Sequence, residues 1–450
     1  MSIGKQAEQQ GTMWLAYDEI PRGMGHAFYD RLQKILCQGG FDAFAEKLCA
    51  EYYAPVAGRP SIPPGRYFRM LLVGYFEGID SERGICWRCS DSLSLREFLR
   101  LDTGQSVPDH SSLCRIRQRL PVEAHHEIFA FVLQLLAQKG LLKGKKLGID
   151  ASTMEANAAL KTIVRRDTGE GYDAMLQRLA IESGIATPSK EDLIRFDRKR
   201  KKKTLSNKDW ESPVDGDSRI AKLKDGRTHL AYKPEHVVDL DSGAIVAVKI
   251  HHTDRGDTAI MHETLADARK KLKTVLGKAA PKYDKPADLA ADKGYHSRDS
   301  LVRLDGAFRS RISEPERKGF SRWRGDAEAR RAVYNNRSRL QSAKGKALQR
   351  LRSERVERSF AHCLDRGGMR RAHLRGDENI EKRYVLHVAG FNLGLLMRSL
   401  FGFGTPKGWA DAPAMLVFEL TPSRFALFLL FWNETTHNFC IIKFENDDFG

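Results

Sequence analysis

The period of the hydrophobic pattern changes near Lys143, and this change constrains the fold more than any other feature of the sequence. Before Lys143, apolar residues recur at helical spacing, most clearly over Glu123–Gln138. After it, short apolar runs typical of strands alternate with amphipathic helical segments. We therefore predict an all-α N-terminal domain over residues 1–143 and a mixed α/β domain over residues 144–400.

The second domain has a definite order of predicted elements. A strand is followed by a hairpin, with Asp241-Ser242-Gly243 as its turn, and then by helix, strand, helix, strand and helix. In chain order these segments are Lys146–Ala151, Leu230–Leu240 with Ala244–His251, Asp257–Gly277 (with Asp257 as a cap), Pro286–Asp292, Ser297–Leu304, Phe308–Ser313 and Ala327–Cys363, the last interrupted near Gly345. A polar stretch at about 160–225 precedes the hairpin, and we predict a partly disordered insertion there.

Composition and charge exclude several classes of protein. The 450 residues carry a net charge of +17, and 41% are hydrophobic, which is enough for a sizeable core. The longest apolar run, Phe425–Trp432, is far shorter than the roughly 18 residues of a membrane-spanning helix. The polar N-terminus shows no secretory signal, and seven cysteines fit reduced thiols better than a disulfide scaffold. We predict a cytoplasmic protein, not bound to a membrane, whose default partner is nucleic acid.

The C-terminal extension, residues 401–450, contains the aromatic run Phe425–Trp432. This run fits a covering strand, an oligomer contact or the product of an altered reading frame. The sequence does not choose among these three interpretations.

Positive charge is concentrated in residues 309–358, which hold sixteen Lys or Arg and six acids. Leu, Ala and Val recur between the charges, so we predict ordered helix here. The arginines predicted to contact nucleic-acid phosphates are Arg322, Arg324, Arg330, Arg331, Arg337, Arg355 and Arg358. Arg115, Arg117 and Arg119, on the predicted helix Leu113–Leu120, are further candidates, with an ordinary surface position as the equal alternative. The run of basic residues at 198–203 is explained equally well as a solvated loop.

Three carboxylates stand where they could perform chemistry. Asp150 and Asp292 each end a predicted strand, and Glu357 lies in the basic helical block. Such a set of hard oxygen ligands suits Mg²⁺ or Mn²⁺. Two ions roughly 4 Å apart could activate a water and stabilise the leaving oxygen at a phosphodiester. On spacing alone, helix capping or pairing with arginine explains these acids better.

Several separate motifs, in the same order along the chain, resemble bacterial insertion-sequence transposases. They are Tyr67–Phe76, Pro108-Asp109-His110-Ser111-Ser112-Leu113, Asp292-Lys293-Gly294-Tyr295, Val356-Glu357-Arg358-Ser359-Phe360-Ala361-His362, Gly367-Gly368-Met369-Arg370-Arg371 and His373-Leu374-Arg375-Gly376. The similarity covers about residues 15–400. It is to DDE transposases of the insertion sequence four and five superfamily, in the branch with a helical N-terminal domain.

This resemblance implies an RNase H-like catalytic domain, a mixed sheet flanked by helices. It implies that Asp150, Asp292 and Glu357 are the catalytic residues and hold Mg²⁺, or Mn²⁺, as two ions per active site. Family members bind the terminal inverted repeats of their element as double-stranded DNA, hydrolyse a strand at each end and join the 3′-hydroxyl to target DNA. A homodimer or higher oligomer in the synaptic complex, in a bacterial nucleoid, is the expected setting.

The chain departs from the family's glutamate motif, which usually reads Tyr, two residues, Arg, three residues, Glu, six residues, Lys. Tyr334 and Arg337 fit its first half, but the next glutamate position is Gln341. Counted from Glu357, the lysine position is Leu364. We predict Glu357 as the third ligand, with Glu354, three residues earlier, as the alternative.

Two other functions stay open at this level. The chain could be a cleavage-deficient DNA-binding repressor or remnant of its element, or an RNase H-like nuclease that cleaves without strand joining. An assay for joining of linear element ends separates the second of these from a transposase.

The remaining candidate sites are weaker. Cys86-Trp87-Arg88-Cys89 is one C-x-x-C without a second pair at zinc spacing. His125-His126 and His251-His252 fit a helix surface and a strand end better than metal ligands. Trp323 could stack on an unpaired base, although a surface-anchoring role suits it better.

Overall fold

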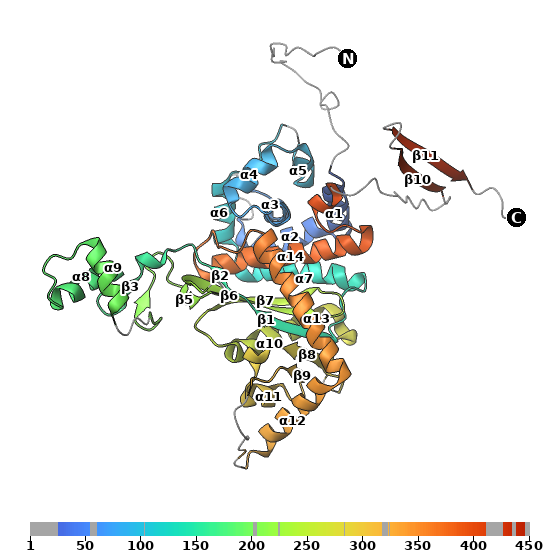
Figure 1. The fold of residues 1–450 in the computed structure, drawn as a ribbon. Helices are drawn as coiled ribbons and strands as arrows, with labels where there is room; N and C mark the ends of the chain where they lie inside the picture. The colour runs from blue at the N-terminus through green and yellow to red at the C-terminus, as the bar shows by residue number, and fades with distance from the viewer. Residues whose placement is uncertain are drawn as a thin grey trace, which may run out of the picture.

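The computed structural model describes residues 26–54, 61–102, 104–200, 205–223, 226–282, 284–316, 323 and 325–410, and the backbone alone of 426–433 and 438–445. Figure 1 shows a central sheet with a helical layer on one side of it and an arm that projects from its edge.

The N-terminal part is helical, as the spacing of its apolar residues predicts. Its helices are α1 (Ala27–Gln38), α2 (Phe41–Cys49), α3 (Pro64–Glu77), α4 (Glu82–Ser90), α5 (Leu93–Phe98), α6 (His110–Arg119) and α7 (Val122–Gln138). The Asp109 carboxylate caps α6 by accepting hydrogen bonds from the backbone amides of Ser111 and Ser112. A helix from the C-terminal part of the chain completes this helical layer, because α14 (Asp377–Phe401) packs against α3 and α7.

The central sheet is mixed, and one strand accounts for the mixture. Across the sheet the order is β7–β6–β1–β8–β9, with β6 antiparallel to both of its neighbours and β1, β8 and β9 mutually parallel. Short strands β2 and β5 also pair with β6, near its beginning. The strands are β1 (Lys146–Ala151), β2 (Met154–Glu155), β5 (Arg219–Lys222), β6 (Thr228–Asp239), β7 (Ile245–His252), β8 (Ala287–Ala291) and β9 (Phe308–Ile312). The predicted order of strand and hairpin, and the mixed α/β class, are confirmed.

Helices cover both faces of this sheet. The covering helices are α10 (Asp257–Leu276), α11 (Arg298–Leu304), α12 (Ala327–Gln341) and α13 (Ala343–Phe360), together with α14. The short α15 (Pro406–Ala410) follows α14 and packs against α1. One face lies under α13 and α14. On this face His236 of β6 stacks on Phe360 of α13, with ring centroids 4.0 Å apart. The hydroxyl of Tyr384, on α14, lies 2.9 Å from Nε2 of His236. The opposite face lies under α10, where Thr264 donates to Glu235.

One predicted helix cap is wrong, and one predicted helix break is confirmed. Asp257 is not the cap of α10, since Gly256 holds that position and the Asp257 carboxylate pairs with Lys233. The break in the predicted helix Ala327–Cys363 falls at Ser342, whose hydroxyl caps α13. Gly345 permits the turn, because a Cβ at that position would lie 2.6 Å from the carbonyl oxygen of Leu340.

The polar insertion is more ordered than predicted over the residues that are described. It contains α8 (Tyr172–Glu182), α9 (Lys190–Lys199) and a ribbon of β3 (Val164–Arg165) with β4 (Trp210–Glu211). A capping box at Ser189 and Asp192 begins α9. These elements form the arm in Figure 1, and disorder is therefore the wrong description of its described part.

Two C-terminal elements bear on the earlier interpretations. Strand β10 (Ala426–Asn433), which contains most of the predicted aromatic run, pairs with β11 (Asn438–Glu445) in a two-stranded ribbon. The segment Asp377–Ala410, which includes α14, is long and apolar enough to cross a membrane by length and composition. Of its most apolar window, 67% is buried inside the protein, which is the pattern of a core helix.

Candidate active site

Asp150 and Asp292 lie side by side at the carboxyl edge of the sheet. Strands β1 and β8 are parallel neighbours, and Gly148 pairs with Ala290. Asp150 lies two residues after Gly148, and Asp292 lies two residues after Ala290. The same strand register therefore places the two aspartates next to each other. The two strands predicted to lead to these aspartates are present, and the sheet topology makes them neighbours.

Helix α13 lies directly over Asp150 because β1 has a glycine beneath the helix. A Cβ at Gly148 would lie 2.8 Å from Leu240, 3.1 Å from Val356 and 3.2 Å from Arg352. Without that Cβ, Arg352 reaches the site, and its Nη1 donates to Asp150 Oδ2 over 2.6 Å. Asp150 Oδ1 accepts from the amide of Ala151 at 2.8 Å.

The two aspartates are electrostatically coupled. Burial raises the pKa of Asp150 to about 6; Arg352 lowers that pKa, and Asp292 raises it. Asp292 Oδ1 accepts from the Gly294 amide at 2.8 Å, and no Lys or Arg pairs with Asp292 among the described residues. A buried carboxyl whose ionisation is opposed by an adjacent carboxylate without an ion pair forms an arrangement that a divalent cation stabilises.

The predicted third ligand is not brought to this pair. Glu357 is exposed on α13, and the carboxylate oxygens of Asp150, Asp292 and Glu357 do not all lie within 4.8 Å of one another. The α13 side chain that faces Asp150 is that of Arg352. Gln349, eight residues before Glu357 on α13, is the residue whose amide donates to the Ala291 carbonyl at the end of β8.

The alternative, Glu354, is engaged elsewhere. Its carboxylate accepts from Arg358 at 2.8 Å on the exposed face of α13. Glu357 has no ion pair among the described residues. This contrast keeps Glu357 ahead of Glu354 as the predicted ligand.

Sequence reasoning missed a buried carboxylate on the other face of the sheet. Glu235 is fully buried beside Ala151 in the β6–β1 register and accepts from the hydroxyl of Tyr295 at 2.8 Å. His251 Nε2 lies 3.6 Å from the same carboxylate. Burial and then Glu235 raise the pKa of the Tyr295 hydroxyl. Tyr295 follows Asp292 by three residues, so this bond fastens the loop that carries Asp292, and the acid within the apolar run of β6 was the available signal.

Only some of the predicted DNA-contacting arginines are available. Arg115 is exposed, and Arg119, also exposed, covers the ring of Tyr53. Arg117 is buried and paired with Glu82, so its predicted role as a phosphate contact is wrong. A core position against the helical layer explains why this arginine differs from its neighbours on α6.

The arginines of the basic block, residues 309–358, also include both exposed side chains and side chains held in ion pairs. Arg330 and Arg331 are exposed on α12, with Arg331 Nε 3.6 Å from Asp305. Arg337 is held by two bonds to Glu314, at 3.1 and 3.0 Å, and the exposed Arg358 pairs with Glu354. Two further candidates, at positions 322 and 324, lie outside the described residues.

Arg355 also departs from expectation. Its Nη1 is the atom that a Cβ at Gly243 would meet, at 3.3 Å, in the turn between β6 and β7. That turn lies at the amino end of β1, because Asp239 pairs with Leu147. The Arg355 guanidinium therefore lies toward the amino end of β1 and away from Asp150, and its contact with a nucleic-acid phosphate stays a prediction.

The environments of the cysteine, histidine and tryptophan candidates explain them as parts of the packed structure. Cys86 and Cys89 are buried on α4, and burial raises the pKa of their thiols to about 11 and about 12, which does not suit metal ligation. His125 is in the core and not on a helix surface. Trp323 is anchored by Tyr334, with ring centroids 5.9 Å apart, and by Arg298 over its ring.

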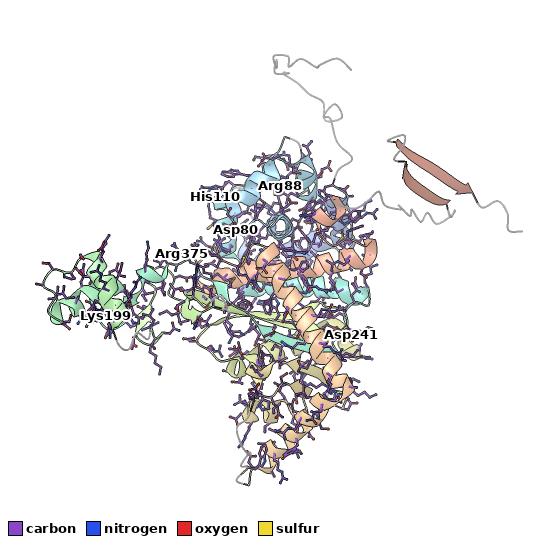
Figure 2. The ribbon with its side chains drawn as sticks, in the orientation of Figure 1. Asp80, Arg88, His110, Lys199, Asp241 and Arg375 are labelled. Atoms are coloured by element: carbon purple, nitrogen blue, oxygen red, sulfur yellow. The ribbon has the colours of Figure 1, made fainter. Side chains whose placement is uncertain are left out.

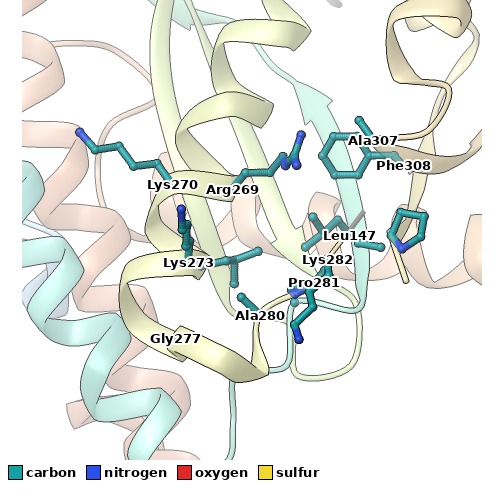
Figure 3. Close-up of a pocket in the computed structure, with 14 residues that line it drawn as sticks. Leu147, Arg269, Lys270, Lys273, Gly277, Ala280, Pro281, Lys282, Ala307 and Phe308 are labelled. Atoms are coloured by element: carbon teal, nitrogen blue, oxygen red, sulfur yellow. The ribbon is translucent and has the colours of Figure 1, made fainter. Parts of the chain in front are cut away.

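A hollow at the opposite edge of the sheet is separate from the acids. It is lined by residues at the amino ends of β1, β8 and β9, including Leu147, Ala287 and Phe308, and by basic residues of α10 such as Arg269 and Lys273 (Figure 3). It contains none of the predicted catalytic carboxylates. The chemistry is therefore sought at the carboxyl edge and not in this hollow.

Comparison with known protein families agrees with this arrangement. Residues 16–119 match a family described as a transposase domain (DUF772), and residues 200–393 match a family described as a transposase DDE domain. The chain belongs to the DDE transposases. The two matches span roughly two thirds of it, and the second includes Asp292 and Glu357 but begins after Asp150. The sheet and its flanking helices are accordingly the RNase H-like fold of a DDE transposase. Neither a curated protein nor a solved structure matches the chain.

A DDE transposase works with divalent metal, and the residues at the carboxyl edge fit such an ion. The donors are hard carboxylate oxygens, and the coupling of Asp150 with Asp292 leaves negative charge that Arg352 balances only in part. Arg352 occupies one oxygen of Asp150, so binding of an ion by both oxygens of Asp150 requires this guanidinium to move.

Proposed function

We propose that this transposase binds the terminal inverted repeats of its insertion sequence, hydrolyses DNA strands at the element ends and joins the 3′-hydroxyls to target DNA. The observation that carries the proposal is that Asp150 and Asp292 lie side by side at the ends of two adjacent parallel strands. Protein of this kind would act in the bacterial cytoplasm, on nucleoid DNA, as a homodimer or larger assembly.

Asp150, Asp292 and Glu357 are the residues that would hold the metal, proposed here as two Mg²⁺ ions. The ions would lower the pKa of a water molecule and stabilise charge on the leaving oxygen. Asp150 can act only when its carboxyl is ionised, which its pKa of about 6 permits at neutral pH. The Tyr295–Glu235 bond keeps Asp292 in place, and the exposed arginines Arg330 and Arg331 would hold the DNA backbone.

The test uses DNA that carries the sequences flanking the gene. We expect strand cleavage at the element ends with Mg²⁺ and none with EDTA. Asp150→Ala and Asp292→Ala should each abolish cleavage and leave binding of the same DNA within a few-fold, because they remove ligands and also negative charge near DNA. Joint loss of DNA binding and folding in both variants would instead make these acids structural.

A cleavage-deficient DNA-binding protein is the second candidate. It is favoured by the Arg352–Asp150 ion pair and by the separation of Glu357 from the two aspartates. Binding of the end DNA without any metal-dependent cleavage would decide for it. Cleavage without joining of 3′ ends to a second DNA would decide for a nuclease.

A further inference from the structure

A second group of metal-type ligands lies at the base of the arm. Asp217, His252 and Asp377 place one ligand atom each within 4.8 Å of one another. They come from the loop before β5, the last residue of β7 and the first residue of α14. No sequence pattern marks this group, because its members are far apart along the chain and the fold alone brings them together.

A buried, unsatisfied oxygen belongs to the same turn. Asp215 is 3% exposed, and its Oδ2 has no hydrogen-bond partner. Its Oδ1 accepts from the hydroxyl of Tyr232 at 2.7 Å and from the amide of Gly376 at 3.1 Å. The next amide, that of Asp377, donates to Asp217 Oδ2 at 3.3 Å. The carboxylates of Asp215 and Asp217 therefore accept hydrogen bonds from two consecutive backbone amides, those of Gly376 and Asp377. Asp215 Oδ2 is left without a partner, and a buried carboxylate oxygen in that state destabilises the fold.

Among the described residues, no lysine or arginine lies against these acids. Asp215, Asp217 and Asp377 form no ion pair with Lys or Arg in the part of the chain that the structure describes. The basic side chains nearest in sequence point elsewhere: Arg219 lies 3.6 Å from Asp254, and Arg375 donates to the carbonyl of Asn157. Burial and Asp217 raise the pKa of Asp377. In a chain with a net charge of +17, three acids gathered without a cation are conspicuous.

We propose that Asp217, His252 and Asp377, with Asp215 beside them, form a second divalent-cation site that is distinct from the Asp150–Asp292 pair. Carboxylates together with an imidazole suit Mn²⁺ or Zn²⁺ better than Mg²⁺. On β6, Tyr232 pairs with His252 and His236 pairs with Asp150, so the two sites are four residues apart along this strand, roughly 13 Å.

The position of this site indicates its role. Asp215 and Asp217 lie where the chain returns from the arm to the sheet, and Asp377 begins the long core helix α14. Arg375, two residues before Asp377, lies near the junction of arm and body, whereas Lys199 lies in the arm (Figure 2). A bound cation would tie the base of the arm to β7 and α14 and would fix the arm relative to the catalytic sheet.

The test uses the full-length Asp150→Ala/Asp292→Ala protein, in which the proposed catalytic ligands are absent. Titration with Mn²⁺, followed by the electron paramagnetic resonance signal of the free ion, should show one bound ion per chain, and Zn²⁺ should compete with it. Adding Asp217→Asn or Asp377→Asn should weaken this binding at least about tenfold. Glu378→Gln is the matched control, because Glu378 follows Asp377 but pairs with Lys382 at 2.7 Å, and it should leave binding unchanged.

Thermal unfolding separates lost binding from lost folding. Without metal, Asp377→Asn should not lower the melting temperature, since it removes repulsion and keeps an oxygen for the bond from the Glu378 amide. With Mn²⁺ or Zn²⁺, the parent should become more stable and the Asn variants should not. Absence of a bound ion in the parent, or binding that persists in both Asn variants, would overturn the proposal. Neither result depends on whether the protein cleaves DNA.

Discussion

Replacing Asp292 by Asn should stabilise the metal-free protein while it abolishes cleavage. Asp150 and Asp292 lie on neighbouring strands about 4.8 Å apart. Two like charges about 5 Å apart repel by ~1 kcal/mol in water and by ~3 kcal/mol at an effective dielectric constant of about 20. Asp292 is partly exposed, so we expect the lower figure, about 1 kcal/mol. Asn keeps an oxygen to accept the bond from the Gly294 amide, which confines the change to charge.

The pH dependence identifies the cause of this stabilisation. The folded protein holds the pKa of Asp150 at about 6, above its ordinary value of 3.8, and Asp292 contributes to the rise. Ionised Asp150 therefore costs stability above about pH 6, and the Asn variant reduces that cost. The difference between variant and parent should be full near pH 8 and should disappear as the pH falls below about 5, where Asp150 is protonated in both.

Thermal or urea unfolding in EDTA at low salt measures this difference, with Asp284→Asn, an exposed loop aspartate, as the control. A destabilised Asp292→Asn variant at pH 8, or a stability difference of equal size at pH 8 and pH 5, would refute the coupling. Added Mg²⁺ should stabilise the parent more than the variant, because the variant lacks a ligand.

The remaining predictions concern the third ligand, the DNA contacts and the buried bond behind the site. Glu357→Gln should eliminate cleavage with Mg²⁺ while Glu354→Gln leaves substantial activity; the reverse result would place the ligand one helical turn earlier, and activity in both would place it elsewhere. Neutralising Arg330 and Arg331 together should reduce the slope of log affinity for DNA against log salt by about 0.9 for each lost phosphate contact, and an unchanged slope would mean that this face of α12 does not meet DNA. Tyr295→Phe leaves a buried carboxylate short of one donor and should cost about 1–3 kcal/mol in the free energy of unfolding and lower the cleavage rate, whereas unchanged stability would show that water replaces the hydroxyl.

Much of the sheet and the position of the aspartates could be predicted from the sequence, because both depend on local pattern. Strands β1 and β8 are short apolar runs, and each leads directly to an aspartate. Parallel strands end at the same edge, so Asp150 and Asp292 could be expected to meet there. The helices of the N-terminal part follow from apolar spacing in the same way.

The side-chain environment of the helices could not be predicted in this way. Which residue of α13 meets Asp150 depends on how the helix crosses the sheet, and Gly148 lets Arg352 approach instead of Glu357. Arg117 is buried because Asn379, more than 250 residues away, and Glu82 meet it in the helical layer. These contacts join distant parts of the chain and leave no periodic signal.

Exchanging a ligand for a soft one tests most directly the claim that the Asp150–Asp292 pair holds the metal for DNA cleavage. Asp292→Cys places a thiolate at the end of β8, and thiolates bind Mn²⁺, Zn²⁺ or Cd²⁺ far better than Mg²⁺. The variant should not cleave end DNA with Mg²⁺, and cleavage should return with one of the softer ions, while Asp292→Ala stays inactive with every ion. Cleavage by Asp292→Cys with Mg²⁺ at the rate of the parent would contradict metal binding by this residue.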